Sequence, residues 1–283
     1  MSDEDLLLPE ALAPFVRNTI FAGHIHYWPE VESTNTLALQ AAALAGPAGI
    51  HGEVFLADEQ TAGRGRSDHA WYSERGVGIY ASFLLRPRIS PADILWLSLL
   101  AALSVHDAVE EVTGLRADIR WPNDLLLSGK KFCGILTEAS SDSTRIQYAV
   151  VGIGINVNQT WFPRELASTA TSLRQEHETG ASRVQLAAAL IRCLDRDYGL
   201  FVQAASRPAA ANGYFGPIMD KIAARSSYIH GKSVHVDEEG GYTGVTDGLD
   251  PRGFLRVRTD RGVRTVISGS VRPLARRADA SGP

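Results

Sequence analysis

The sequence is poor in cysteine, in long apolar runs and in surplus positive charge. Only two cysteines occur among 283 residues, and Cys133 and Cys193 lie too far apart for any metal-ligand spacing, so we interpret them as structural thiols in a reducing compartment. No run of about 18 or more apolar residues is present to span a membrane. The N-terminus opens on acidic residues, where a secretory signal would be positive. The net charge of −4 disfavours a nucleic-acid binder. We therefore expect a cytoplasmic protein with no membrane segment.

What is present fits a globular protein of two parts. The composition is 45% hydrophobic and 21% charged, enough apolar material for a sizeable core. The chain is long for one domain, so we expect a large domain followed by a small one. We predict a domain at residues 1–228, a second at 229–277 and a disordered tail at 278–283.

The two predicted parts differ in their expected secondary structure. The first mixes strands and helices, whereas the second has only short, evenly spaced β-rich runs separated by glycine-containing turns, which is typical of a small antiparallel barrel. In the first part we expect strands at 24–31, 54–57, 78–85, 118–121, 125–127, 132–136 and 147–157. We expect helices from Ser33 or Thr34 to Gly46, over about five turns from Pro91, at 182–204 and near 215–226. In the second part we expect strands at 233–236, 242–246, 254–258 and 263–267.

A glycine–arginine loop is the strongest chemical signal. Residues 60–66 read Gln-Thr-Ala-Gly-Arg-Gly-Arg and directly follow the predicted strand 54–57. Glycine disfavours regular structure, but it lets backbone N–H groups approach phosphate oxygens. Arg64 and Arg66 add charge and bidentate geometry. The alternative is a solvated surface turn, yet alternating glycine and arginine after a buried strand favours an anion-binding loop.

Three further segments each permit a bland and a functional interpretation. Residues 32–35, Glu-Ser-Thr-Asn, are a helix cap, and the same hydroxyl and N–H groups could bind a polar head group. Residues 120–124, Arg-Trp-Pro-Asn-Asp, are a strand end and turn, and they could also coordinate hydrated Mg²⁺ or fix a catalytic lysine. Residues 130–136 form a hairpin strand in which Lys131 could point inward as a fixed positive charge.

Residues 151–157 read Val-Gly-Ile-Gly-Ile-Asn-Val and only superficially resemble a dinucleotide fingerprint. A third glycine in register is missing and no helix is expected to follow, so we reject a Rossmann site. Glycines in a buried strand instead mark the close approach of another backbone or a ligand.

The order and content of these segments resemble the biotin protein ligases, the enzymes that biotinylate carboxylase carrier domains. The resemblance runs from about residue 25 to 274. It is carried by residues 32–35, 60–66, Trp71, 120–124, Lys131 with 134–136, and 152–156. It implies an α+β fold, in which a mixed β-sheet with packed helices of the class II synthetase type precedes an SH3-like barrel. It also implies that biotin and ATP give biotinyl-5′-AMP, from which a carrier lysine takes the biotin.

The resemblance also implies roles for individual residues. It implies biotin binding by Ser33, Thr34, Asn35, Gln60, Gly63, Arg64, Gly65, Arg66 and Lys131. It implies ATP and phosphate binding by Arg64, Arg66, Trp71, Asn123, Lys131 and Asn156. It implies catalytic roles for Arg66, Lys131 and Asp124, with Asp124 also a ligand of Mg²⁺.

Two features depart from some members of that family. Residues 67–70, Ser-Asp-His-Ala, stand where a second glycine and more basic residues often follow, so we expect a changed rate of loop ordering or adenylate retention. Only about two dozen residues precede the first matching segment, too few for the winged helix-turn-helix of repressor members. We therefore expect no DNA binding, and two copies could pair through exposed sheet edges.

Three alternatives remain at this point. The first is a lipoate or octanoate ligase or transferase on the same fold. The second is a biotin-sensing regulator that has lost catalysis, which the two loop arginines and Lys131 argue against. The third is a nucleotide-binding domain of unrelated chemistry.

Overall fold

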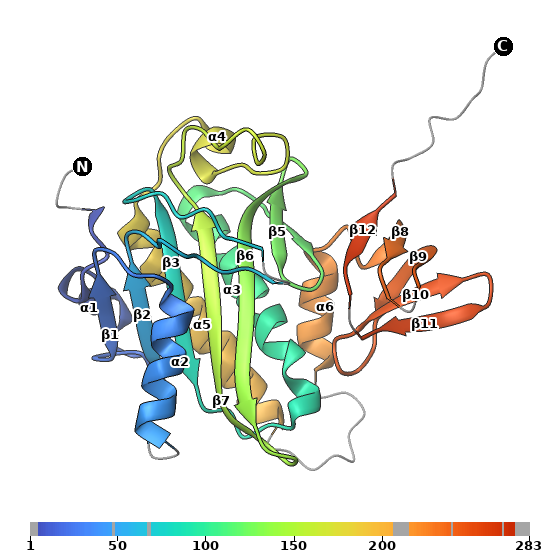
Figure 1. The fold of residues 1–283 in the computed structure, drawn as a ribbon, viewed down its shortest axis with the longest axis horizontal. Coiled ribbons are helices and arrows are strands. Elements are labelled where there is room, and N and C mark those ends of the chain that lie inside the picture. Colours follow the sequence, from blue (N-terminus) through green and yellow to red (C-terminus); the bar gives the residue numbers. More distant parts are fainter. Residues whose placement is uncertain are drawn as a thin grey trace.

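A seven-stranded mixed sheet forms the larger part of the molecule (Figure 1). The computed structural model describes residues 5–46, 49–66, 69–205, 215–238, 240–267 and 269–274. The strand order is β1-β2-β3-β7-β6-β5-β4. Their bounds are Ile25–Trp28 (β1), Glu53–Ala57 (β2), Gly78–Leu85 (β3), Asp118–Arg120 (β4), Asp124–Leu127 (β5), Lys130–Ser141 (β6) and Ile146–Asn156 (β7). Each expected strand of this part is present.

The sheet is antiparallel except at one edge, where β1 runs parallel to β2. The middle of the sheet is its most buried part, because all eight residues of β3 are buried. β3 pairs with β7 from Gly78 opposite Asn156 to Leu85 opposite Ala149. β7 in turn pairs with β6, with Gly134 opposite Gly154. The glycine-containing segment 151–157 is thus an inner strand rather than the start of a nucleotide-binding helix.

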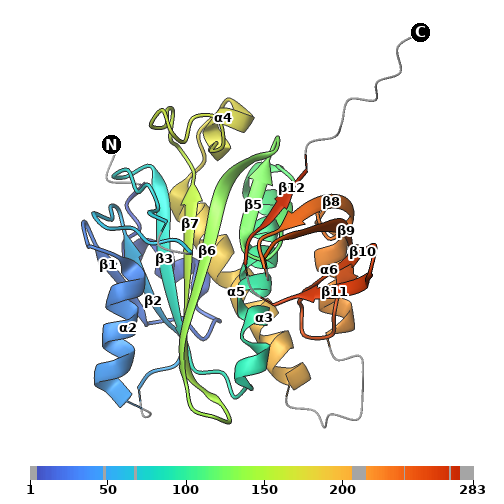
Figure 2. The same cartoon turned by 45° about the vertical axis from the view of Figure 1, so that its right-hand side comes forward.

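Helices cover the two faces of the sheet unequally (Figure 2). One face carries α3 (Leu95–Thr113) and α5 (Arg183–Ala205), with α1 (Pro9–Val16) packed against α5. The other face carries α2 (Thr34–Ala45) over β2, β3 and β7. Ala38 and Ala42 of α2 form a small apolar cluster with Phe55, Leu84 and Val150 of the sheet. The rest of this face is left for the loop that follows β2.

The helix from Pro91 begins with a 3₁₀ turn, Pro91–Asp93, and continues as α3. Residues 91–113 meet the length and composition of a membrane span, which corrects the expectation that the chain has no such stretch. In the folded protein 72% of its apolar window is buried. Its side chains pack on the sheet and on α5, which is the environment of a core helix.

A buried arginine ties the helix side of the molecule to the end of β2. Arg183, the first residue of α5, is 1% exposed. Its guanidinium donates to Asp58 Oδ1 at 2.8 Å and to the carbonyl of Gly78 at 3.2 Å. Tyr27 donates to the other oxygen of Asp58 at 2.7 Å. Because Asp58 directly follows β2, this network fixes the point from which the glycine–arginine loop departs.

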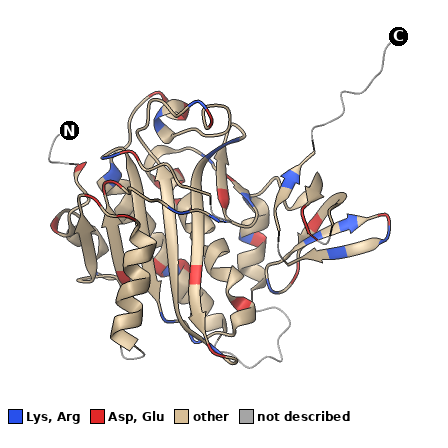
Figure 3. Cartoon of the chain, in the orientation of Figure 1, with Lys and Arg blue, Asp and Glu red and all other residues tan. Residues whose placement is uncertain are grey.

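The C-terminal part is a five-stranded antiparallel sheet in the order β11-β10-β9-β8-β12. Its strands are His230–Val236 (β8), Tyr242–Leu249 (β9), Leu255–Thr259 (β10), Gly262–Val266 (β11) and Val271–Pro273 (β12). Both strands of the β10–β11 hairpin carry arginine (Figure 3). The indole N–H of Trp121 donates to the carbonyl of Gly253 at 2.9 Å, which links the two sheets.

The predicted boundary after residue 228 falls between α6 (Gly216–Ala224) and β8. Sequence reasoning missed β12 and the short helix α4 (Leu173–His177). The predicted tail, 278–283, lies outside the described residues.

Candidate active site

The start of α2 supplies three buried polar side chains. Ser33 occupies the N-cap position in extended backbone, and Ser33, Thr34 and Asn35 are all 4% exposed or less. The Ser33 hydroxyl makes no capping hydrogen bond. Instead, the side-chain oxygen of Gln60 accepts from the N–H of Thr34 at 2.9 Å and from its hydroxyl at 3.2 Å. The loop after β2 therefore caps this helix from outside.

Ser82 in the middle of β3 continues this polar network. Its hydroxyl oxygen lies 2.7 Å from Thr34 Oγ1 and 2.6 Å from Asn35 Oδ1, and the side chain is fully buried. Gln60 donates from Nε2 to Ser73 at 2.9 Å. Buried polar groups that are bonded in this way are held in fixed orientations. Sequence reasoning missed Ser82, although a hydroxyl within an apolar strand was a usable signal.

Glycines in β6 and β7 form a flat floor beside this network. A Cβ atom on Gly154 would lie 2.5 Å from the indole of Trp71, and one on Gly134 would lie 2.8 Å from it. The side chain of Asn35 lies still closer to the position of a Cβ atom on Gly152. The expectation at these glycines was the close approach of another backbone or a ligand, whereas in the structure side chains approach them. Sequence reasoning noted these glycines, but it did not place Trp71 on them.

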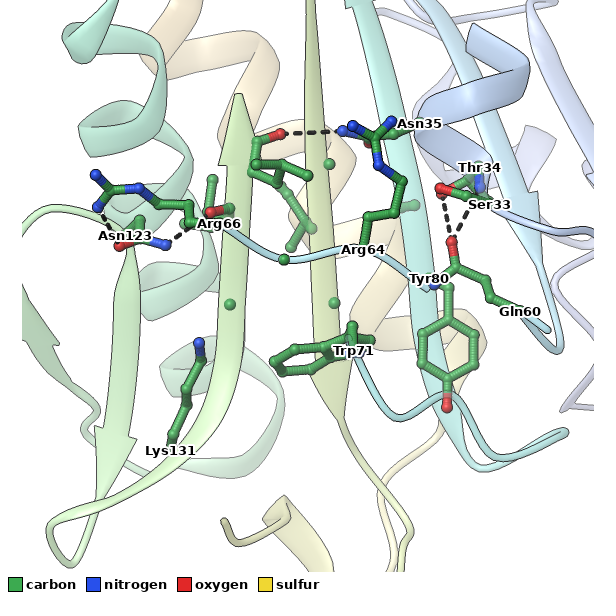
Figure 4. A pocket seen from close by; sticks show the side chains of 18 residues that line it. Ser33, Thr34, Asn35, Gln60, Arg64, Arg66, Trp71, Tyr80, Asn123 and Lys131 are labelled. Atoms are coloured by element: carbon green, nitrogen blue, oxygen red, sulfur yellow. Dashed lines mark hydrogen bonds between the residues drawn. The ribbon is translucent and has the colours of Figure 1, made fainter. Parts of the chain in front are cut away.

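The glycine–arginine loop crosses the sheet over that floor (Figure 4). Its two sides meet where the N–H of Trp71 donates to the carbonyl of Gly63 at 2.8 Å and Gly65 donates to His69 at 2.7 Å. Arg64 reaches Glu138 on β6 at 2.7 Å. Ser67 and Asp68, part of the predicted departure in the loop, lie outside the described residues. Sequence reasoning missed Glu138.

Arg66 points to the other end of the site, where it donates to the side-chain oxygen of Asn123 at 3.2 Å. The Asn123 amide in turn donates to the carbonyl of Ile135 at 2.9 Å. Figure 4 shows Trp71 between Lys131 on one side and Gln60 on the other. The Lys131 ammonium lies 5.3 Å from the centre of the indole, within cation–π range.

Lys131 and Asp124 form an ion pair. Lys131 Nζ is 2.6 Å from Asp124 Oδ1, and Arg120 approaches the other oxygen at 2.6 Å. Burial alone would raise the pKa of the Asp124 carboxyl, but Lys131 and Arg120 together hold this pKa below its ordinary value. The sequence suggested that residues 120–124 could either coordinate Mg²⁺ or fix a lysine. The ion pair of Asp124 with Lys131 matches the second of these.

The loop after β7 forms backbone hydrogen bonds with Lys131. The N–H of Lys131 donates to the carbonyl of Thr169 at 2.8 Å, and its carbonyl accepts from Thr171 at 3.0 Å. Asn156 is buried and donates to the carbonyl of Thr171 at 3.0 Å. This backbone pairing fixes the strand end from which the ammonium projects.

One cavity of about 40 Å³ joins most of the predicted site residues. It is lined by Ser33, Thr34, Asn35, Gln60, Arg64, Gly65, Arg66, Trp71, Asn123 and Lys131, among others. A larger cleft of about 800 Å³ adjoins it and shares Arg66, Trp71, Asn123 and Lys131. Asp124 and Asn156 line this cleft, whereas Gly63 packs beneath the loop against the Trp71 carbonyl and Ser73. The C-terminal part contributes Asp237, which follows β8, and Arg272 of β12 to the cleft.

Comparison with known proteins shows the family to which this chain belongs. The biotin/lipoate A/B protein ligase family matches residues 28–156, which include every predicted site residue. The bifunctional ligase/repressor BirA of Bacillus subtilis is 33% identical over 260 residues, 90% of this chain and 76% of that protein. The biotin–[acetyl-CoA-carboxylase] ligase of Mycobacterium tuberculosis is 32% identical over 279 residues, 94% of this chain and 96% of that protein. The chain belongs to the biotin protein ligase family.

A solved member of the biotin protein ligase family has the same fold. The biotin protein ligase from Aquifex aeolicus in complex with biotin and ATP superposes with a TM-score of 0.74 at 30% identity. The match covers 89% of this chain and all of that one. The expected family and the expected mixed sheet with a C-terminal β-domain are therefore confirmed.

Proposed function

We propose that this chain is an ATP-dependent biotin protein ligase. A carboxylate oxygen of biotin attacks the α-phosphorus of ATP, the bond to pyrophosphate breaks, and biotinyl-5′-AMP forms. The amine of a carrier-domain lysine then attacks the acyl carbon of this anhydride, loses a proton and displaces AMP. The acceptor would be the biotin carboxyl carrier domain of a carboxylase.

The single observation that supports this reaction best is the convergence of three cations on one cavity. Arg64, Arg66 and Lys131 come from two segments far apart in the sequence, yet all line the same 40 Å³ space. A carboxylate and a triphosphate repel one another, and fixed positive charge offsets that repulsion. The same charge stabilises the additional negative charge that develops at the α-phosphate. Lys131 is prepared for this task because Asp124 orients its ammonium.

The uncharged end of the cavity suits the head group of biotin. Ser33, Thr34, Asn35 and Gln60 present hydroxyl and amide groups, and the network through Ser82 holds Thr34 and Asn35 in place. A cyclic urea needs both donors and acceptors, which these side chains supply. We assign these four residues to biotin recognition.

The larger cleft suits the nucleotide. It continues from Arg66 and Lys131 past Trp71 and Asn156 toward the C-terminal sheet. We assign Arg64, Arg66, Asn123 and Lys131 to the phosphates, and Trp71 and Asn156 to the nucleotide side. Gly65 lets the loop backbone lie close to the bound molecules, whereas Gly63 lets the loop pack on the Trp71 carbonyl and Ser73.

The described residues do not fit a magnesium ion held by the protein. Both oxygens of Asp124 are taken by Lys131 and Arg120. Within the described ranges, no group of three or more His, Cys, Asp or Glu side chains could hold a metal. Mg²⁺ commonly binds through substrate phosphates. In our proposal it therefore enters only as part of the substrate MgATP, and no step depends on it.

The test mixes the protein with ATP, an acetyl-CoA carboxylase carrier domain and either biotin or lipoate. We expect pyrophosphate release and acceptor labelling with biotin and neither with lipoate. Labelling with lipoate alone would establish the lipoate ligase alternative. Biotin binding without pyrophosphate release would establish the non-catalytic regulator. The cytoplasmic location, the lack of DNA binding and the pairing of two copies stay predictions.

A further inference from the structure

One ion pair connects the glycine–arginine loop to the sheet. Arg64 Nη2 lies 2.7 Å from Glu138 Oε1, and both side chains are partly exposed. Within the described residues, Arg66 makes no ion pair and meets only the neutral amide of Asn123. The two loop arginines therefore differ, because one is already neutralised by a carboxylate of the protein and the other is not.

The second oxygen of Glu138 belongs to the polar network at the start of α2. Asn35 Nδ2 donates to Glu138 Oε2 at 2.9 Å, and Ser82 holds the other end of the Asn35 amide. A continuous chain of contacts runs through Arg64, Glu138, Asn35, Ser82, Thr34, Gln60 and Ser73. Arg64 and Ser73, the two ends of this series of contacts, lie on the loop before and after Trp71. The contacts therefore hold the loop over the cavity.

The glycine–arginine loop forms one wall of the cavity proposed for the substrate. Arg64, Gly65 and Arg66 line this cavity, and it adjoins the larger cleft. A substrate that enters here therefore comes to lie beside Arg64. Moving the loop off the sheet separates Arg64 from Glu138. The entering molecule carries a carboxylate, which is the same group that Glu138 offers to Arg64.

We propose that Glu138 is a positioning residue whose carboxylate holds Arg64 until the carboxylate or phosphate oxygens of the ligand replace it. Glu138 thereby sets how readily the loop opens and competes directly with the substrate for Arg64. The identity of that substrate rests on the proposed function, whereas the hold on the ligand-free loop does not.

The test uses Glu138→Gln, which keeps the shape and an oxygen for Asn35 but removes the charge. In the ligand-free protein we expect trypsin to cut after Arg64 and Arg66 about threefold faster, as loss of a partly exposed ion pair predicts. The KM for biotin should fall about threefold while kcat stays the same, because the competitor is gone. If the only role of Glu138 were to support Asn35, the KM of Glu138→Gln for biotin would rise instead.

Two controls make the result specific. Glu111→Gln removes a carboxylate of a comparable surface ion pair with Arg192, far from the site, and should change neither readout. In an Arg64→Gln background, adding Glu138→Gln should have no further effect on either readout. Unchanged cleavage, or a higher KM, in Glu138→Gln would overturn the proposal. A wild-type protein without pyrophosphate release would instead refute the proposed function, because the cleavage assay needs no ligand.

Discussion

The two ends of the active site are built on different physical terms. At the α2 end, Thr34, Asn35, Gln60 and Ser82 are neutral, largely buried and joined by hydrogen bonds. At the other end, Arg66, Lys131 and the Lys131 partner Asp124 are charged and border an open cleft. The side chains of the first end are joined by hydrogen bonds before any ligand arrives, whereas the second end holds its charges on a loop and a strand end.

In the proposed function, this difference separates biotin recognition from the chemistry at the phosphate. A fixed set of donors and acceptors selects one head group, because each wrong partner leaves a buried polar atom unpaired. Charges near water interact weakly until the site closes and excludes water, after which they stabilise the reacting phosphate much more. We therefore expect substitutions at the neutral end to change mainly KM and those at the charged end mainly kcat.

The largest expected effect is at the charged end. Lys131→Ala should reduce biotinyl-5′-AMP formation by about 100-fold or more, on the scale of removing one electrostatic stabiliser. The fold should persist, since Arg120 still pairs with Asp124. Pyrophosphate release under saturating biotin and ATP measures the loss, and circular dichroism checks the fold.

Lys130→Ala is the matched control, because Lys130 is the exposed neighbour of Lys131 on the same hairpin. It should keep nearly normal pyrophosphate release. Near-normal release in Lys131→Ala as well would remove Lys131 from the chemistry and leave the comparison without its charged end.

The boundary between the two ends runs through Trp71, and Gly154 is the place to disturb it. A Cβ atom there would lie 2.5 Å from the indole and would push it off the glycine floor. Overpacking of this kind costs about 2 kcal/mol, so Gly154→Ala should lower kcat/KM for biotin by about 30-fold. Steady-state kinetics at saturating ATP measures this value.

Gly199→Ala is the control for that substitution, because Gly199 lies in α5 with nothing within 4 Å of the added Cβ. It should leave activity unchanged and raise stability, as alanine does in a helix. Equal activity of both variants would mean that Trp71 has another position when substrates bind.

Features that depend on neighbouring residues could be predicted from the sequence, whereas features that depend on contacts between distant residues could not. Local patterns predicted the apolar strand β3, the hairpin of β5 and β6, and the glycine–arginine loop, because neighbouring residues determine them. Ser82 and Glu138 were missed because their roles depend on Asn35, which reaches them only after three strands and α2 have packed. The resemblance to a known family supplied the roles that spacing alone left open.

A smaller effect is expected at the neutral end from Ser82→Ala. The change leaves the Asn35 amide oxygen without its hydroxyl partner in a buried site, at a cost of about 1.4 kcal/mol. The KM for biotin should therefore rise about tenfold while kcat remains unchanged. Ser104→Ala is the control, since Ser104 is equally buried but bonds Asp197 on the opposite face. An equal rise in KM for both variants would show a general loss of stability rather than loss of recognition.

The smallest effect is expected outside the active site, at the charged cluster of Asp107, Arg196 and Arg225. This cluster tests what charge contributes to stability rather than to catalysis. Burial raises the pKa of Asp107, but the hydrogen bond with His106 and the charges of Arg225 and Arg196 outweigh it and lower this pKa to about 2. A carboxylate whose pKa falls on folding stabilises the protein at pH values above the pKa of the unfolded state, which is about 3.9. This stabilisation is lost as the pH falls through the pKa of the folded state.

Because the arginine partners of Asp107 are partly exposed, we expect Asp107→Asn to lower the free energy of unfolding by only about 1 kcal/mol at pH 7. Urea titrations should show this difference shrinking between about pH 4 and pH 2, with the KM for biotin unchanged throughout. A difference that stayed constant down to pH 2 would mean that packing, rather than the charge of Asp107, holds α3 to α5. The ion pairs of Asp124 would then be the better example of charge that this fold depends on.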